Sequence, residues 1–431
     1  MPSRLVITLV WLIFPTLAAC SAPPAPATAG AEFLYVWTGD EDGADPDFLA
    51  VFDVRPGSAR YGELIRTVPV EGRANWPHHT EHELATGRTL FANGWNTGRT
   101  FVFDLSRPDA PRVVHSFTAV GGYAYPHSYA RLPNGNVLAT FQSLAGDYTP
   151  PGGLVELDES GALVRAVSGA SPEIATEDTW PYSLLVLPDL DRVVTTNTRM
   201  GTVAEWFAGK DAVADVHAHA VGRDTRPTHV QVWRLSSLEL LATLRLPAQA
   251  GGHHEHPAEP RRLANGEVLV NTFTCGLYRI VGLETEHAAI EPVLHSPFES
   301  PKWCSVPVVL GNYWIQPSAT EDAIVAYDLS DPAGPGGAAR VSVGGRFLAP
   351  HWLALDPSGN RIVVTADDPA FWVMLLHVDP ATGRLSVDER FRDAGSDRPG
   401  VSFDRTHWPH GATGKAMPHG AVFSARRGSF D

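Results

Sequence analysis

The chain has 431 residues and a formal net charge of −15, from 33 Lys and Arg against 48 Asp and Glu. This acidic balance, without a basic cluster, argues against nucleic acid and acidic lipid surfaces as partners. The 39 Gly and 36 Pro are typical of an all-β protein with many turns. At ~150 residues per domain the length suggests two or three domains, but an internal repeat permits a single large one.

The N-terminus has the features of an export signal. Residues 5–19 are almost wholly apolar after Arg4, a run short for a membrane span. Leu-Ala-Ala before Cys20 resembles a bacterial lipobox, which predicts a signal peptide over residues 1–19 and lipidation of Cys20. Residues 20–31 then form a flexible tether. We expect attachment to the cell envelope, facing the periplasm or exterior, with membrane contact only through the anchor. An ordinary cleaved signal peptide is the alternative.

Residues 32–431 are predicted to form one domain built from a repeated trio of strands. Strand patterns cover residues 33–38, 49–54 and 64–70. The middle strand recurs at residues 100–105, 153–157, 229–235, 277–281, 323–329 and 373–378. The C-terminal residues 420–423 supply a seventh innermost strand. We therefore predict an all-β, seven-bladed β-propeller, closed by pairing of the C-terminal strand with the N-terminal blade. A pair of β-sandwiches fits seven copies poorly.

One polar position recurs in the repeat. When the copies are aligned on the apolar residue before the first turn, equivalent positions hold His79, His127, Tyr182, Ala258, Cys304, His351 and His419. The first strand of each propeller blade lines the central channel, so equivalent positions face one mouth of it. His254 and His256 precede the fifth copy and are expected to reach the same mouth.

This convergence predicts a metal site. The expected ligands are His79, His127, His351, His419, His254 and His256. Several neutral imidazoles suit copper, zinc, iron or nickel rather than magnesium or calcium. The histidines alone leave the choice among these metals open. For any single histidine, a hydrogen bond to neighbouring backbone is the simpler interpretation; the recurrence favours metal.

Residues 76–83 pack three histidines and two carboxylates into eight positions. His78 and His82 flank the expected ligand His79, and we expect them to shuttle protons. The spacing of residues 78–82 also matches a metalloprotease motif, but that motif needs a helix, and Pro77 and a strand pattern argue against one. Trp76, Tyr123 and Tyr125 are candidates for the wall of a small apolar pocket for a methyl group, and packing is the simpler role for them. Once Cys20 is set aside, Cys275 and Cys304 remain; they either pair or stay buried thiols, and a copper-binding thiolate at Cys304 is a lesser alternative.

Several stretches resemble the selenium-binding protein family, whose bacterial members include methanethiol oxidase. Residues 47–56 resemble the family's PDYLATVDVDP, and residues 326–332 resemble its QYDISDP. The pair His78–His79, His127 before a Gly turn, and His419 near the C-terminus match family histidines. The resemblance implies a seven-bladed propeller with a histidine-bound copper site and, in the oxidase branch, oxidation of thiols by O2.

The chain also departs from that family. Gly62 stands where the family has the cysteine tied to selenium binding, so selenium binding does not carry over. His351 stands where animal members of the family have glutamine, and residues 257–261 keep the family's PLEIR only in part. Three classes of function remain: an oxidase of methanethiol or a similar small thiol with O2, a non-catalytic propeller binding metal, ligand or envelope proteins, and a hydrolase or lactonase. The scarcity of carboxylates at the recurring position disfavours the third, and the sequence leaves open whether the protein is an enzyme.

Overall fold

A computed structural model describes residues 30–84, 88–146, 148–176, 179–201, 228–247, 256–294, 304–330, 339–342, 349–366 and 371–425. The expected signal peptide, Cys20 and nearly all of the tether lie outside these ranges, and so does His254. Within the described part of the chain, no helix has the length and apolar character needed to cross a membrane.

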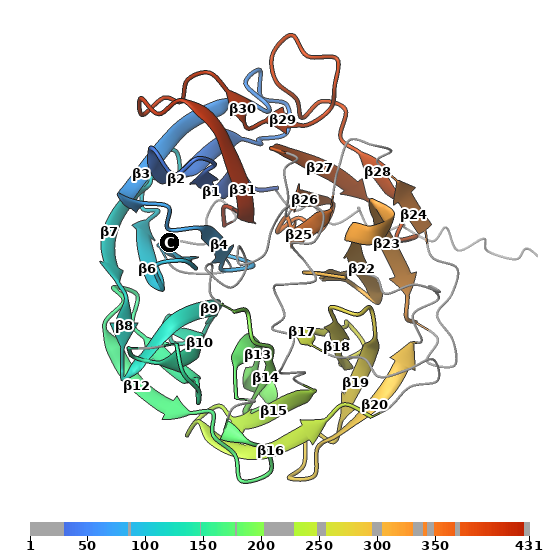
Figure 1. Ribbon diagram of the computed structural model, residues 1–431. Helices are drawn as coiled ribbons and strands as arrows, with labels where there is room; N and C mark the ends of the chain where they lie inside the picture. Colours follow the sequence, from blue (N-terminus) through green and yellow to red (C-terminus); the bar gives the residue numbers. More distant parts are fainter. Residues whose placement is uncertain are drawn as a thin grey trace, which may run out of the picture.

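Seven antiparallel sheets stand around a ring (Figure 1), which confirms the predicted β-propeller. Blade one holds β1 (Phe33–Asp40), β2 (Pro46–Asp53), β3 (Leu64–Arg73), β30 (Asp404–Arg405) and β31 (Gly414–Phe423). Blade two holds β4 (Pro77–Thr80), β5 (Thr89–Gly94), β6 (Arg99–Asp104) and β7 (Arg112–Phe117). Blade three holds β8 (Ala119–Val120), β9 (Tyr123–Arg131), β10 (Val137–Leu144), β11 (Gly153–Leu157) and β12 (Leu163–Ser168).

The other four blades follow the same plan. Blade four holds β13 (Pro181–Leu187), β14 (Arg192–Asn197), β15 (His229–Arg234) and β16 (Glu239–Arg245). Blade five holds β17 (Pro257–Arg262), β18 (Val268–Thr272), β19 (Leu277–Val281) and β20 (Ala289–Leu294). Blade six holds β21 (Val308–Leu310), β22 (Tyr313–Ser318), β23 (Ala323–Asp328) and β24 (Ala339–Ser342). Blade seven holds β25 (Pro350–Leu355), β26 (Arg361–Ala366), β27 (Trp372–Val378), β28 (Leu385–Val387) and β29 (Val401–Ser402).

Two short 3-10 helices, η2 (Pro188–Leu190) and η4 (Ala319–Glu321), lie between the strands of blades four and six. Strands in the middle of the blades, such as β5 and β11, are buried nearly throughout because neighbouring blades cover both faces. Outer strands such as β12 are largely exposed. The rigid inner part of each blade therefore faces the channel, where the recurring polar position lies.

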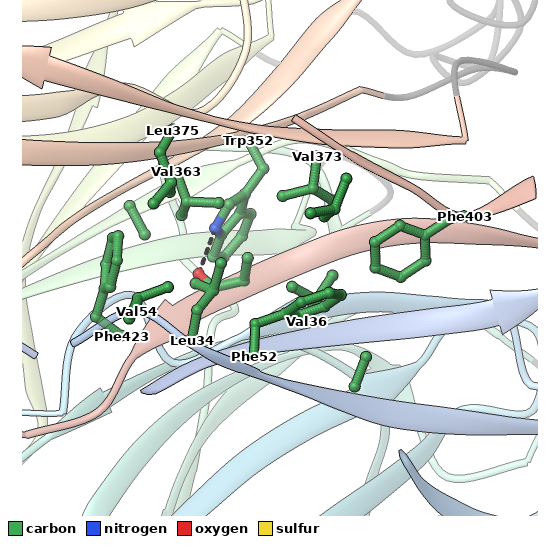
Figure 2. Close-up of a cluster of buried hydrophobic side chains, with 14 of the residues drawn as sticks. Leu34, Val36, Phe52, Val54, Trp352, Val363, Val373, Leu375, Phe403 and Phe423 are labelled. Carbon is green, nitrogen blue, oxygen red and sulfur yellow. Dashed lines mark hydrogen bonds between the residues drawn. The ribbon is translucent and has the colours of Figure 1, made fainter. Parts of the chain in front are cut away.

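The ring is sealed by both ends of the chain, as predicted. Strand β31 pairs with β1, with Leu34 opposite Phe423 and Val36 opposite Ala421 (Figure 1). Leu34, Val36 and Phe423 also pack against side chains of blade seven in one buried cluster (Figure 2). In this cluster the indole Nε1 of Trp352 donates a hydrogen bond to the carbonyl of Ala421 at 2.7 Å. Closure leaves no open sheet edge at the seam.

Candidate metal centre

The innermost strands share a β-bulge directly after a proline. The pairing register shifts after Pro77, Pro126, Pro181, Pro257, Pro350 and Pro418. In four of these strands the residue before the proline has a positive φ: Trp76, Tyr125, His256 and Ala349. A bulge leaves residues unpaired and re-aims their side chains. The residues placed in this way are His78–His79, His127–Ser128, Tyr182–Ser183, Ala258–Glu259, His351 and His419–Gly420.

Polar side chains on the second strands hold these bulges in place. Asn93 Oδ1 accepts a hydrogen bond from the His79 amide at 2.6 Å, and its Nδ2 donates to the Pro126 carbonyl of the next blade at 2.6 Å. Thr140 does the same with the Ser128 amide and the Tyr182 carbonyl, at 3.0 and 2.7 Å. Thr196, Asn271 and Thr365 likewise donate to a carbonyl of the next blade. We call these five side chains the belt; each links its own blade to the inner segment of the next blade.

Gly420 allows the closing strand to approach the histidine pair. A Cβ on Gly420 would lie 2.6 Å from the carbonyl oxygen of His78 and 2.8 Å from the amide nitrogen of Thr80. Both contacts are with backbone, which cannot move away easily. The absence of a side chain therefore lets β31 bring His419 alongside β4.

Three buried imidazoles form a first donor group, which we call the imidazole group: His78, His79 and His127. Each offers one nitrogen, and these nitrogens all lie within 4.8 Å of one another. The Nε2 atoms of His78 and His127 are 3.1 Å apart. The rings of His79 and His127 have centroids 4.2 Å apart. This cluster comes from β4 and β9, two neighbouring blades.

Hydrogen bonds orient these rings. His127 Nδ1 lies 2.8 Å from the Tyr182 carbonyl, which can only accept, so Nδ1 carries the proton and Nε2 the lone pair. The hydroxyl of Ser128 lies 3.1 Å from the Nδ1 atoms of both His79 and His127. Among the described residues His79 Nε2 has no hydrogen-bond partner, although it is buried. Such contacts to the far ring nitrogen are what metal-binding histidines use to fix their tautomer.

His351 and His419 extend the cluster. The ring of His419 lies 4.3 Å from that of His78 and 4.7 Å from that of His351, centroid to centroid. His419 Nδ1 donates to the carbonyl oxygen of His78 at 2.8 Å, which leaves its Nε2 as the lone-pair nitrogen. The structure thus brings four of the six predicted ligands into one cluster: His79, His127, His351 and His419.

A second donor group lies beside the first, and we call it the mixed group: His79, His82 and Glu259. Its donor atoms also lie within 4.8 Å of one another. His82 follows β4, and its ring stacks on Trp352 at 4.4 Å with an interplanar angle of 6°. Glu259 lies on the β17 bulge and is fully buried. Its Oε2 accepts hydrogen bonds from Ser183 and, at 2.9 Å, from Arg261 Nη1, and lies 3.5 Å from His82 Nε2.

Burial sets the protonation states. It lowers the pKa of His79, His82 and His127 well below the ordinary histidine value, because a charged imidazole would lose its hydration. Neighbouring histidines lower the pKa of His79 further, and Arg261 does so for His82. Burial raises the pKa of Glu259, and Arg261 opposes that shift. The histidines are therefore neutral near pH 7, the form that binds metal.

Aromatic side chains border this cluster on one side. A buried set comprises Trp95, Tyr148, Trp180, Tyr182, Met200, Ala258 and Phe273. The Tyr182 ring lies 3.8 Å from the His127 ring, centroid to centroid. Trp76 and Tyr125 pack against this set, whereas Tyr123 belongs to a different cluster with Phe91 and Tyr129.

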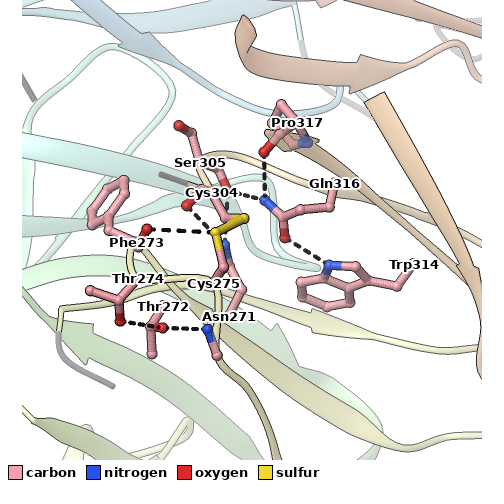
Figure 3. The surroundings of a disulfide bond; sticks show 11 residues. Asn271, Thr272, Phe273, Thr274, Cys275, Cys304, Ser305, Trp314, Gln316 and Pro317 are labelled. Atoms are coloured by element: carbon pink, nitrogen blue, oxygen red, sulfur yellow. Dashed lines mark hydrogen bonds between the residues drawn. A yellow bond between two sulfur atoms is a disulfide. The ribbon is translucent and has the colours of Figure 1, made fainter. Parts of the chain in front are cut away.

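Not every predicted site residue joins the cluster. His256 is buried just before β17, but it belongs to neither donor group found among the described residues. His78, expected to shuttle protons, lies within the imidazole group. Cys275 and Cys304 form a disulfide (Figure 3), so Cys304 does not offer a thiolate. Sequence reasoning missed Glu259, Ser128 and the belt; the recurring Asn or Thr on the second strands was the available signal.

Comparison with known proteins supports the family resemblance over part of the chain. No family model matches. A methanethiol oxidase from Ruegeria pomeroyi is 35% identical over 153 residues, which cover 34% of this chain and 34% of that protein. Selenium-binding protein 3 of Arabidopsis thaliana is 28% identical over 122 residues, 25% of each chain. The matched segments thus span about a third or less of these relatives. The predicted resemblance to selenium-binding proteins and methanethiol oxidases is confirmed at this level.

Solved structures extend the likeness to the whole fold. A hypothetical selenium-binding protein from Sulfolobus tokodaii superposes with a TM-score of 0.71 and 17% identity, over 95% of this chain and 96% of that one. A periplasmic gluconolactonase from Pseudomonas aeruginosa has a TM-score of 0.58 and 14% identity, over 92% and 99%. At such identities these likenesses establish the propeller fold alone.

Proposed function

We propose that the protein is a copper-dependent oxidoreductase that oxidises methanethiol or a similar small thiol with O2. The observation that carries this proposal is the convergence of His78, His79 and His127, whose donor nitrogens lie within 4.8 Å of one another. The partial similarity to two methanethiol oxidases, at 35% and 34% identity, supports the reaction class.

The donor set fits copper. All three groups are imidazoles, which suit copper, with zinc or iron as alternatives. His127 has its Nδ1 proton directed to a carbonyl, so Nε2 is free of a proton and can bind metal. His79 Nε2 has no hydrogen-bond partner in the described part of the chain. His351 and His419 lie close enough to complete the site. Bound copper would supply a redox-active Lewis acid for a thiolate and O2.

The chain's own residues supply the rest of the chemistry. We assign His78 to the metal, because its Nε2 lies 3.1 Å from that of His127. His82 is the better placed proton acceptor, since its side chain is 19% exposed and Glu259 Oε2 lies 3.5 Å away. Trp76 and Tyr125, packed against the buried aromatic set, form an apolar wall suited to a methyl group. Burial of the cluster keeps bulk water from the reacting atoms.

The reaction balances as a two-electron oxidation. Methanethiol, O2 and water give formaldehyde, hydrogen sulfide and hydrogen peroxide. The carbon–sulfur bond breaks, the carbon gains its oxygen from water, and O2 takes two electrons and two protons.

The test is oxygen uptake with sulfide and peroxide release by copper-loaded protein. We expect turnover by the wild type and its loss in His79→Gln. Absence of turnover above free copper, with copper demonstrably bound, would favour the alternative: a non-catalytic propeller that binds metal, a ligand or envelope proteins.

We also propose that the protein is lipid-anchored through Cys20 to the cell envelope, facing the periplasm or exterior. The support is the lipobox-like run before Cys20 and the Pro- and Ala-rich tether after it. Cys20→Ser is expected to move the protein out of the membrane fraction. Unchanged membrane fractionation of that variant would contradict the anchor.

A further inference from the structure

The mixed group differs in kind from the imidazole group next to it. It combines two imidazoles, His79 and His82, with the carboxylate of Glu259. The carboxylate comes from blade five, whereas both histidines come from blade two. Two imidazoles and one carboxylate are the ligand set of non-haem Fe²⁺ sites, and carboxylate oxygen also suits Mn²⁺. An all-imidazole set favours copper instead.

Glu259 has fewer hydrogen bonds among the described residues than a buried carboxylate with a purely structural role would have. Glu81 is a useful contrast, because it too is buried and paired with an arginine. Both oxygens of Glu81 accept hydrogen bonds: Oε1 from Arg131 Nε at 3.0 Å, and Oε2 from Arg131 Nη2 at 2.8 Å and from the Phe91 amide at 3.0 Å. Glu259 engages Ser183 and Arg261 through Oε2, and its Oε1 has no hydrogen-bond partner among the described residues.

The two histidines of this group differ in their surroundings: Arg261 Nη2 lies 3.2 Å from His82 Nδ1 and 3.4 Å from its Nε2, so a cation bound to His82 takes the place of that contact. His79 Nε2 is buried and has no hydrogen-bond partner in the described ranges. The ring of His82 is held by stacking on Trp352. A buried polar atom left without a partner destabilises the fold, and two such atoms, His79 Nε2 and Glu259 Oε1, belong to this one group. A cation held between them would satisfy both.

We propose that His79, His82 and Glu259 form a second cation site, which takes a harder divalent metal of the Fe²⁺ or Mn²⁺ class. This site is distinct from the copper site and does not depend on thiol oxidation. Since His79 belongs to both donor groups, one ion at a time can use it, and the two sites exclude each other. The metal that the protein acquires therefore decides which donor group it uses.

The test measures the binding of two metals to the full-length protein and its variants. Mn²⁺ binding is followed by loss of the electron paramagnetic resonance signal of the free ion, and Cu²⁺ binding by the spectrum of the bound ion. We expect Glu259→Gln and His82→Gln to weaken Mn²⁺ binding by ~10–100-fold or more while Cu²⁺ binding stays within about threefold of wild type. His78→Gln should do the reverse, and His79→Gln should weaken both.

Glu81→Gln is the matched control, because it removes a buried, arginine-paired carboxylate that belongs to neither donor group. It is expected to leave both metals bound. The proposal is overturned if wild type binds no Mn²⁺ at millimolar concentration, or if Glu259→Gln leaves Mn²⁺ binding unchanged or lowers Cu²⁺ binding equally. Unchanged Cu²⁺ binding in His78→Gln would count against the copper site proposed above, and the second site would stand.

Discussion

The two halves of the ring share one scaffold and differ in chemistry. In blades seven, one, two and three the inner strands carry imidazoles just after the proline: His351, His419, His78, His79 and His127. In blades four and five the same bulge presents Tyr182 with Ser183, and Ala258 with Glu259. Thr140 and Thr196 make the same pair of hydrogen bonds in the two halves.

This comparison separates the residues that form the mouth of the channel from the residues that we propose bind metal there. Bulges and belt occur in both halves, so they belong to the propeller itself. The imidazoles occur in one half, so they are additions to a scaffold that stands without them. Among the described residues, Glu259 is the one residue of the second half that belongs to a donor group. Changes in the belt and changes in the imidazoles should therefore have different consequences.

The largest expected effect is the loss of copper affinity when a histidine of the imidazole group is replaced, compared with a buried histidine outside both donor groups. His127→Gln should weaken copper binding by ~1,000-fold or more, about 4 kcal/mol, because even residues that only orient ligands cost ~10–100-fold. His229→Gln in blade four is the control, since His229 is buried but belongs to neither donor group. Calorimetric titration with copper measures both. Equal losses in the two variants would contradict the site.

The disulfide belongs to the half whose bulges carry no imidazole and should affect stability alone. Cys275 and Cys304 are 29 residues apart and join blade five to the start of blade six (Figure 3). Closing a loop of this length stabilises a fold by about 3–4 kcal/mol. The double variant Cys275→Ser, Cys304→Ser should lose that much unfolding free energy in a denaturant titration and retain copper affinity. A loss of copper affinity would show that the two halves are coupled.

One belt residue from each half allows the effect on stability to be distinguished from the effect on copper binding. Thr140→Val and Thr196→Val should each cost about 1–3 kcal/mol of unfolding free energy, since each removes the hydrogen bond of a buried backbone amide, that of Ser128 or that of Ser183. Thr140 shares the Tyr182 carbonyl with His127 Nδ1, so only Thr140→Val should also lower copper affinity, by ~10–100-fold. Similar copper affinities in both variants would mean that the belt does not orient the ligands.

The smallest effect concerns acid stability. Burial, helped by Arg245, lowers the pKa of His229 to about 4. An unfolded histidine titrates near pH ~6.5, so the unfolded state binds more protons below that pH. Stability is therefore lost as the pH falls from about 6.5 toward 4. The unfolding free energy of His229→Gln should therefore fall by about 1 kcal/mol less between pH 7 and 5 than that of the wild type, as measured by denaturant titrations. An unchanged slope would mean that His229 does not contribute.

The sequence by itself determined the number of blades and the closure of the ring. Strand patterns of period two, repeated with turns between them, admit few other folds, and residues 420–423 had no partner except the N-terminal strands. In the same repeat, His79, His127, His351 and His419 occupy equivalent positions. Equivalent residues of a propeller meet at one end of the channel, so the sequence also predicted that these histidines lie together.

Only the tertiary structure decided which side chains share a donor group. Glu259 lies far along the chain from His79 and His82, and it meets them because the ring brings β17 opposite β4. His256, three residues earlier, joins neither group, because it precedes the bulge rather than lying on it. The disulfide was likewise settled by the approach of two blades. A bulge changes the direction of a side chain without changing the pattern of apolar residues, so no reading of that pattern reveals it.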